Sequence, residues 1–391
     1  MGLDFSNTEI AFKGKSSLRL TKAYLLFKIV SSKTLVAVGS AVTKTALKLH
    51  LPINYFIKKT IFEQFCGGEY IDECDATIKE LAKFNIGTIL DYSVEGKEGD
   101  ADLDRTAEEI IKTIEKAQQN PSIPFSVFKP TGVSQFSILE KANNGIEKLT
   151  PTEKQQYERV LARIDRICKK AYDLKVPLYI DAEDSWIQDT IDRIVEQMMQ
   201  KYNQEEVIVY NTLQMYRWDR LDYLKKSHQH ALDNNYKIGV KLVRGAYMEK
   251  ERARALEKGY TSPIQKDKEA TDRDYDLAVQ YCIEHINDFA LCAGTHNEKS
   301  CLNLARLIEK HQLDKKDKRI YFAQLLGMSD HISYNLANEG YNVTKYVPYG
   351  PIREVLPYLI RRAEENTSVS GQTGRELSLI IKEKKRRKNK A

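Results

Sequence analysis

Short runs of β-branched and aromatic residues alternate with longer amphipathic stretches along most of this chain. Each short run has the length and composition of a buried strand. The eight runs cover residues 86–93, 124–130, 177–183, 207–214, 237–245, 289–297, 319–326 and 342–350. The clearest stretches of helical periodicity between them are 106–119, 187–202, 217–232 and 301–311. Strands that alternate with helices predict parallel βαβ units.

The number of these units favours one fold class. Eight βα units are what a closed barrel needs, although a doubly wound sheet of similar length is compatible with the same pattern. We therefore expect an α/β protein with a distorted (β/α)₈, TIM-like barrel and an N-terminal helical extension. The predicted domains are a basic helical extension over 1–84, a catalytic barrel over 85–375 and a basic tail over 376–391.

Charge changes this picture only at the two ends of the chain. The net charge of +6 is modest for 391 residues, so it does not indicate a nucleic-acid partner. Residues 10–62, however, contain lysines and arginines but no acidic residue. Within that stretch, residues 18–51 mix apolar residues with spaced lysines, which suits amphipathic helices on an anionic membrane surface. A helical subdomain packed on the barrel explains the pattern equally well.

Cysteines and targeting signals add little. The six cysteines form no CxxC pair and show no metal-ligand spacing, so reduced intracellular thiols and no metal site are expected. No apolar run is long enough to span a bilayer. The first residues, MGLDFSNTEI, do not read as a secretory signal. The acid-free basic stretch is also compatible with an organellar transit segment.

Polar residues stand at the ends of the predicted strands. Active sites of (β/α)₈ barrels are built at the mouth formed by the carboxyl ends of the strands. The candidates there are Lys129, Asp181, Gln214, Arg244 to Tyr247, Thr295, His296, Asn297, Gln324 and Tyr346. Because seven strand ends share this feature, we expect a polar site at the mouth.

The segment YLIRRAEEN follows the eighth strand. At helical spacing, Tyr358, Arg361, Arg362 and Glu365 share one stripe. One interpretation is a surface helix with an ordinary arginine–glutamate pair. The other is an anion site, because two neighbouring guanidinium groups can bind a carboxylate bidentately. Pro357 is expected to kink or restart this helix.

Lys129, at the end of the second strand, has three interpretations. It is a Schiff-base lysine, a further cation for the same carboxylate, or an ion-pair partner of Asp181 on the next strand. Asp181 and Glu183 fall on one side of that strand. Paired carboxylates suit acid–base chemistry or a metal, but the many cations nearby favour ion pairing.

Two further segments, KLVRGAY and AGTHN, have the features of anion-binding loops. Gly245 and Gly294 let the backbone approach an anion, while Arg244 and His296 add positive charge and donors. Neither segment is a GxGxxG fingerprint.

Taken together, these segments resemble the proline dehydrogenase family, and within it the monofunctional, mitochondrial-type members. The pieces occur in family order over about residues 85–370; they are VFKPTGV, YIDAEDSWIQ, VYNTLQMY, GVKLVRGAYMEKERA, AGTHN, FAQLLGMSDHIS and YNVTKYVPYGPIREVLPYLIRRAEENTSV. The resemblance implies a barrel that binds FAD at its mouth and transfers a hydride from C5 of L-proline to flavin N5. The product would be Δ1-pyrroline-5-carboxylate, and a membrane quinone would take the electrons, which is the first step of proline catabolism to glutamate.

The resemblance also implies roles for individual residues. The catalytic positions are Lys129, Asp181, Tyr346, Arg361, Arg362 and Glu365: the cations would bind the proline carboxylate, and the two acids would hold those cations. The walls around the proline ring would be Tyr247, Ala246, Leu325, Tyr346 and Tyr358. The FAD contacts would be Asp181, Gln214, Lys241, Val243, Arg244, Gly245, Ala246, Lys268, Thr271, Thr295, His296, Asn297, Gln324 and Leu325. Lys241 stands where bifunctional members have arginine, and Lys268 and Thr271 align only loosely.

Partners and location follow from the same resemblance. No aldehyde dehydrogenase half and no DNA-binding module are apparent, so a separate pyrroline-5-carboxylate dehydrogenase would consume the product. The expected location is the cytoplasmic face of a bacterial inner membrane, or the mitochondrial inner membrane in a eukaryote. In the family a small residue at the position of Tyr346 accompanies hydroxyproline use, so this tyrosine indicates proline.

Two other functions remain open at this point. A Schiff-base aldolase would use Lys129 as its nucleophile. A non-enzymatic adaptor for a membrane or a nucleic acid would use the basic ends of the chain.

Overall fold

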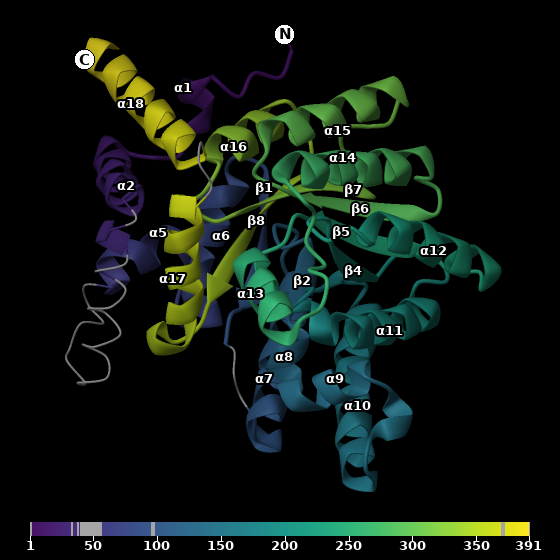
Figure 1. Ribbon diagram of the computed structural model, residues 1–391. Helices are drawn as coiled ribbons and strands as arrows, with labels where there is room; N and C mark the ends of the chain where they lie inside the picture. The colour runs from purple at the N-terminus through teal and green to yellow at the C-terminus, as the bar shows by residue number, and fades with distance from the viewer. Residues whose placement is uncertain are drawn as a thin grey trace. The chain divides into compact units, whose positions relative to one another are not determined.

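The computed structural model describes residues 2–32, 34–36, 39, 57–94, 98–368 and 372–390, with backbone only for 362–368, 372 and 373. It contains eight parallel strands that close in chain order into a barrel (Figure 1). The strands are β1 (Ile86–Tyr92), β2 (Phe125–Phe128), β3 (Leu178–Ile180), β4 (Val209–Gln214), β5 (Ile238–Val243), β6 (Phe289–Gly294), β7 (Ile320–Leu325) and β8 (Val343–Tyr349). The predicted (β/α)₈ barrel is therefore confirmed, and the doubly wound sheet is excluded.

The chain forms two compact units. One unit is continuous and spans Glu95–Ala323; the other combines Met1–Val94 with Gln324–Ala391. The helices of the continuous unit are α7 (Asp100–Gln118), α8 (Pro130–Val133), α9 (Phe136–Asn143), η3 (Ile146–Lys148), α10 (Pro151–Leu174), α11 (Ser185–Tyr202), α12 (Arg220–Asp233), α13 (Met248–Lys258), α14 (Lys268–Glu284) and α15 (Glu298–Lys310). All four helices expected from periodicity are present, with ends shifted by a few residues.

Aromatic side chains fill the space between the strands of the continuous unit. Phe125 stacks on Tyr179 with ring centroids 4.5 Å apart, and Tyr210 and Tyr321 meet Phe125 edge-on at 5.7 and 4.7 Å. Gly239 faces this layer; a Cβ there would come within 2.6 Å of the Tyr210 ring. The aromatic layer is the floor above which the polar ends of the strands lie.

The second unit contains the two ends of the chain. Its helices are α1 (Thr8–Ala11), α2 (Ser17–Val30), η1 (Lys58–Phe62), α5 (Glu63–Phe65), η2 (Ile71–Cys74), α6 (Asp75–Ala82), α16 (Asp330–Asn338), α17 (Ile352–Ser368) and α18 (Gln372–Lys390). β1 pairs with β8 in register from Ile86 and Val343 onward. The helix α17 runs through Pro357 as one element, so the expected restart there is not observed.

The basic C-terminal segment is a packed helix. Figure 1 shows α18 beside α1 and α2, and Leu379 and Ile380 share a buried core with Phe27. The Arg387 guanidinium donates to the carbonyl oxygens of Phe12 and Lys15 at 2.9 and 2.8 Å, and it pairs with buried Glu383 at 2.7 Å. Part of the basic charge near the C-terminus therefore binds the N-terminal helices. No helix among the described residues is long and apolar enough to cross a membrane.

Candidate active site

Most predicted site residues of the continuous unit lie near or just after the carboxyl ends of its strands, whereas Lys268 and Thr271 lie in α14. Lys129 follows β2, Asp181 follows β3, Gln214 ends β4, and Lys241 lies in β5. Side chains alternate along a strand, and Lys241 is in register with Thr212 on one side and Cys292 on the other. This register places Lys241 on the same face of the sheet as the aromatic layer.

A buried ion pair joins two of these residues. The Lys241 ammonium donates to Asp181 Oδ1 at 2.5 Å, and it lies 5.4 Å from the centre of the Tyr179 ring. The side chain of Lys241 is only 5% exposed, so its charge needs a partner to remain in the interior. Asp181 thus serves in an ion pair, but with Lys241, whereas Lys129 was the partner considered from the sequence.

Glu183 was not predicted as a site residue, but it supports one. Its carboxylate accepts hydrogen bonds from the backbone N–H and the hydroxyl of Thr131, at 3.1 and 2.7 Å. Its own backbone N–H donates to Gln188 at 2.8 Å. Because Thr131 lies two residues after Lys129, Glu183 holds the turn that follows this lysine. The sequence signal was the second acid of YIDAED, whose partner is 52 residues away.

Arg244 is held from three sides. Its guanidinium donates to Asp272 at 2.7 Å, to the Thr295 hydroxyl at 2.7 Å and to the Ser300 hydroxyl at 3.0 Å. It also stacks on the Tyr275 ring at 4.3 Å. Burial raises the pKa of Asp272, but hydrogen bonding from Lys268 and the charge of Arg244 outweigh burial and lower the pKa. The predicted residues Arg244, Lys268 and Thr295 are thus linked through one carboxylate.

The loop after β5 presents backbone rather than side chains. Gly245 has φ +126°, and a Cβ there would come within 2.5 Å of the Tyr216 ring, so only glycine fits. Gly245 and Ala246 are exposed, and Tyr247 and Val243 are half-buried. The loop therefore leaves its backbone open to a ligand, as expected for an anion-binding turn.

Two other predicted contacts, Asn297 and Thr271, make hydrogen bonds within the structure. Asn297 caps α15, since its Oδ1 accepts from the backbone N–H groups of Lys299 and Ser300 at 2.9 and 3.3 Å. The Thr271 hydroxyl donates to the Asp267 carbonyl at 3.2 Å. His296 is half-buried in the same turn as Asn297. A ligand in this region would meet the end of a helix as well as side chains.

The second unit contains the remaining predicted residues. Leu325 is half-buried, whereas Tyr346 and Tyr358 are 8% and 6% exposed. The backbone N–H of Leu326 donates to the Tyr346 carbonyl at 2.8 Å. Gln324 precedes Leu325 in β7, so the two side chains point to opposite faces of the strand. The Oε1 of Gln324 accepts a hydrogen bond from Ser333 of α16 at 2.8 Å. The side chain of Gln324 is thus directed to a helix.

The arginine pair lies in α17. Arg361 is half-buried on this helix. Arg362 and Glu365 belong to the same helix, but their side chains lie outside the described part of the structure. The shared stripe predicted for these residues is consistent with the helical backbone through Ser368.

A buried charge network next to Tyr346 was also not predicted. Lys345 is fully buried, pairs with Asp330 at 3.0 Å, and donates to the Met328 and Leu325 carbonyls at 2.5 and 3.3 Å. Burial raises the pKa of Asp330, but the charges of Lys15 and Lys345 hold it well below its usual range. Lys345 and Tyr346 are neighbours in β8, so Lys345 holds the segment from Leu325 to Met328 against this strand.

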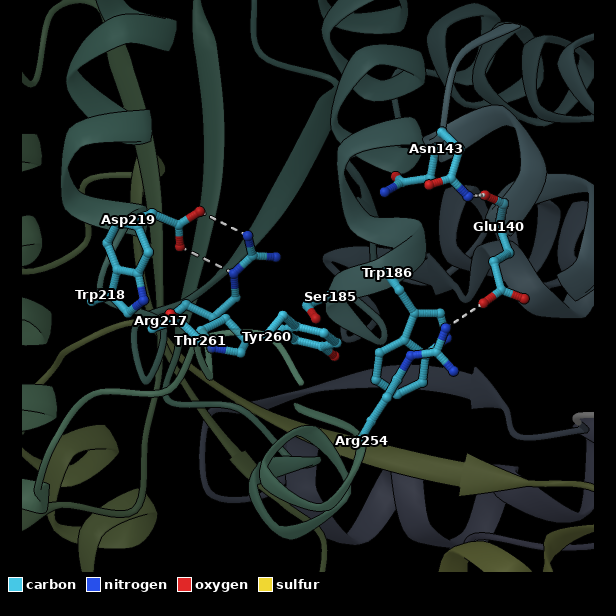
Figure 2. A pocket seen from close by; sticks show the side chains of 12 residues that line it. Glu140, Asn143, Ser185, Trp186, Arg217, Trp218, Asp219, Arg254, Tyr260 and Thr261 are labelled. Carbon is cyan, nitrogen blue, oxygen red and sulfur yellow. Dashed lines mark hydrogen bonds and ion pairs between the residues drawn. The ribbon is translucent and has the colours of Figure 1, made fainter. Parts of the chain in front are cut away.

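A pocket of about 350 Å³ lies in the continuous unit, and none of the residues that line it is a predicted site residue (Figure 2). Asp219 binds Arg217 on one wall, with Nε–O and Nη–O distances of 3.0 and 2.7 Å. On the other wall, Arg254 stacks on Trp186 at 4.3 Å and pairs with Glu140 at 2.6 Å. The charged groups of each wall thus neutralise one another.

The unfolding free energy of Asp219→Asn is expected to fall less steeply with decreasing pH than that of the parent. Burial raises the pKa of Asp219, but hydrogen bonds from Arg220 and Arg217 lower it to about 2. A lowered folded pKa stabilises the fold above about pH 4, and this contribution is lost as pH falls toward 2. The variant should lose about 2 kcal/mol of unfolding free energy at pH 7, and the difference from the parent should shrink below pH 4.

Urea unfolding at pH 7, 4 and 3 measures this effect. Asp189→Asn is the matched control, because Asp189 is 56% exposed and 4.0 Å from Arg217. A constant difference between Asp219→Asn and the parent at all three pH values would contradict the prediction.

Comparisons with known proteins identify the family to which this sequence is similar. A sequence model of the family described as proline dehydrogenase matches residues 74–375. The chain is 34% identical to "Proline dehydrogenase 1, mitochondrial" of Dictyostelium discoideum, over 98% of this chain and 75% of that protein. It is 35% identical to "Carbapenem antibiotics biosynthesis protein CarD" of Pectobacterium carotovorum subsp. carotovorum, over 83% of each.

A solved structure shares the fold. Proline utilization A from Bdellovibrio bacteriovorus, inactivated by N-propargylglycine, matches with a TM-score of 0.71 at 18% identity. The match covers 92% of this chain but 38% of that chain. At this identity the likeness establishes the barrel fold and nothing of the other protein's further activities.

Proposed function

The chain belongs to the proline dehydrogenase family, which makes it an enzyme that oxidises proline, and we propose that it uses FAD to form Δ1-pyrroline-5-carboxylate. The observation that carries this proposal is the set of cations in or just after strands β2 and β5: Lys129, the Lys241–Asp181 pair and Arg244 with its three acceptors. A substrate carboxylate and a cofactor pyrophosphate both need such groups.

The residues present suit FAD. Gln214 Oε1 is buried and has no hydrogen-bond partner among the described residues, so it offers an acceptor to a flavin N–H. Gly245 and Ala246 offer open backbone, and Arg244, Lys268 and His296 offer positive charge for the phosphates. The proposed set of FAD contacts also includes Asp181, Lys241, Val243, Thr271, Thr295, Asn297, Gln324 and Leu325. Bound FAD would accept the hydride that leaves C5 of proline.

The chain's own residues would bind and orient proline. We assign the substrate carboxylate to Lys129, Arg361 and Arg362, with Glu365 aiming the arginines and Asp181 holding Lys241. Fixing the carboxylate in this way orients C5, and such positioning contributes several kcal/mol to catalysis. Dense positive charge favours the neutral amine that the reaction needs. Tyr247, Ala246, Leu325, Tyr346 and Tyr358 would exclude water around the ring.

Tyr346→Ser is expected to shift selectivity from proline toward hydroxyproline. Tyr346 is 8% exposed in the middle of β8, and a serine would leave room for a ring hydroxyl. The ratio of kcat/KM for hydroxyproline to that for proline should rise by about tenfold, within the range that one pocket group controls. Tyr341→Ser is a control, since Tyr341 is also 8% exposed but precedes β8. An unchanged ratio in Tyr346→Ser would remove this residue from the ring wall.

We further propose a quinone as the electron acceptor and a peripheral membrane position. In α2, Leu18, Leu25 and Ile29 are 70%, 53% and 51% exposed at helical spacing, within the acid-free segment. Exposed apolar residues beside lysines and arginines suit an anionic lipid surface. The proposed location is the cytoplasmic face of a bacterial inner membrane, or the mitochondrial inner membrane in a eukaryote. Sedimentation with anionic liposomes, compared for the parent and Leu18→Ser/Leu25→Ser, tests this placement; equal sedimentation would refute it.

A proline-dependent dye-reduction assay on the purified protein tests the central proposal. A yellow protein with flavin absorbance that reduces the dye with L-proline supports it, and a separate pyrroline-5-carboxylate dehydrogenase added to the assay should consume the product. A colourless protein that borohydride traps with an aldehyde on Lys129 would instead indicate an aldolase. Lipid or nucleic-acid binding without turnover would indicate an adaptor.

A further inference from the structure

Two histidines and an aspartate meet at the end of the strands opposite to the candidate active site. His228 lies in α12, His285 is the C-terminal cap of α14, and Asp288 immediately precedes β6. One donor atom from each side chain lies within 4.8 Å of the other two. His228 is 60 residues from Asp288 in sequence, and the packing of α12 against α14 brings it beside His285 and Asp288.

The His228 ring is held in a fixed orientation. It is 4% exposed, its Nδ1 lies 2.8 Å from the Tyr281 hydroxyl, and its ring packs on Phe289 with centroids 4.8 Å apart. The other nitrogen, Nε2, lies 3.2 Å from Asp288 Oδ2. An imidazole with one nitrogen anchored and the other facing a carboxylate has the arrangement of a metal ligand with its outer hydrogen bond.

The spacings of His228 from Asp288 and from His285 are close to those of a tetrahedral zinc site. With zinc–ligand distances of about 2.0–2.1 Å, two ligand atoms on a tetrahedral ion lie about 3.3 Å apart, and two imidazole centroids lie about 5 Å apart. The His228–Asp288 atoms are 3.2 Å apart, and the His228 and His285 ring centroids are 4.9 Å apart. His285 is exposed, so its ring can close the remaining gap.

We propose that His228, His285 and Asp288 bind one Zn²⁺, with water as the fourth ligand. Two imidazoles and one carboxylate suit zinc, whereas Mg²⁺ and Ca²⁺ require mostly oxygen ligands. The position of His285 at the C-terminal end of α14 adds the favourable end of the helix dipole for a cation. Residues at this face of a barrel serve stability. The ion would therefore join α12, α14 and the start of β6.

Calorimetric titration of the EDTA-treated full-length protein with ZnCl₂ tests the proposal. We expect one zinc per chain, an increase in Tm on binding, and no binding of Mg²⁺ or Ca²⁺. His285→Ala and Asp288→Asn should each weaken binding by about 100-fold, and Tyr281→Phe by about tenfold through loss of the outer hydrogen bond. Co²⁺ in place of Zn²⁺ should give visible absorption bands in the parent that both ligand variants lose.

His311→Ala is the matched control. His311 is exposed and caps the C-terminal end of α15, as His285 caps α14, but it is not part of the cluster. It should bind zinc like the parent. Equal zinc affinity in the parent, His285→Ala and Asp288→Asn, or no binding at all, would overturn the proposal and leave His228 and Asp288 as a hydrogen-bonded pair. These measurements do not use proline, so they are independent of the proposed activity.

Discussion

Arg361→Ala is expected to raise the KM for L-proline by about 100-fold or more. Arg361 lies half-buried on α17, and we assign it to the substrate carboxylate together with Lys129 and Arg362. Loss of one partner from a hydrogen-bonded charge pair costs roughly 2–5 kcal/mol, and each 1.4 kcal/mol is a factor of ten. The loss should fall mainly on KM, because the carboxylate does not react and is held in the same way before and during hydride transfer.

Steady-state kinetics with a dye acceptor, together with the flavin absorbance of the purified variant, measure this loss. Arg353→Ala is the matched control, because Arg353 is an exposed arginine near the start of the same helix. A KM for Arg361→Ala within about threefold of the parent would exclude Arg361 from the carboxylate site. Loss of flavin absorbance would show that the arginine supports the cofactor instead.

Asp181→Ala is expected to destabilise the protein by about 3–5 kcal/mol and to abolish proline turnover. The change leaves the Lys241 ammonium, 5% exposed, without its carboxylate at 2.5 Å. An uncompensated charge in the interior is costly, and removal of one partner has effects of this size. Urea unfolding at pH 7 gives the stability, and the dye assay gives the activity.

A double variant separates the two effects. Asp181→Asn with Lys241→Met removes both charges, so most of the lost stability should return. Activity should stay absent, because both residues are proposed to contact the flavin. Full stability in Asp181→Ala would contradict the ion-pair argument, and full activity in the double variant would remove both residues from the proposed site.

The strands were predictable because each one is specified by a short stretch of consecutive residues. Each buried parallel strand is a short apolar run, and the residue that ends it falls at the barrel mouth whatever its distant contacts are. Lys129, Asp181 and Gln214 could therefore be selected from their positions alone, whereas Lys241 followed only from the family resemblance. The helix α17 followed from period 3.6, although its course through Pro357 did not.

The partners of these residues were not predictable, because they depend on packing between distant segments. Glu183 reaches Thr131 across 52 positions, and Asp330 pairs with both Lys15 and Lys345. The sequence also gave no reason to expect that Gln324 turns toward Ser333. The prediction of a basic tail missed a packing contact for the same reason. Positive charge is the most obvious feature of this segment, but its apolar residues Leu379 and Ile380 determine where α18 packs.

The division of the chain has a consequence for biosynthesis. Residues 95–323 are continuous, so this unit can gain its contacts while the ribosome is still adding the remainder. Residues 1–94 emerge first, but β1 pairs with β8, and Lys15 pairs with Asp330. The segment 1–94 must therefore wait until α16 and β8 have been added before it can make these contacts. Chaperones that hold nascent apolar segments should bind it during this interval, and a stop codon before α18 should prolong that binding.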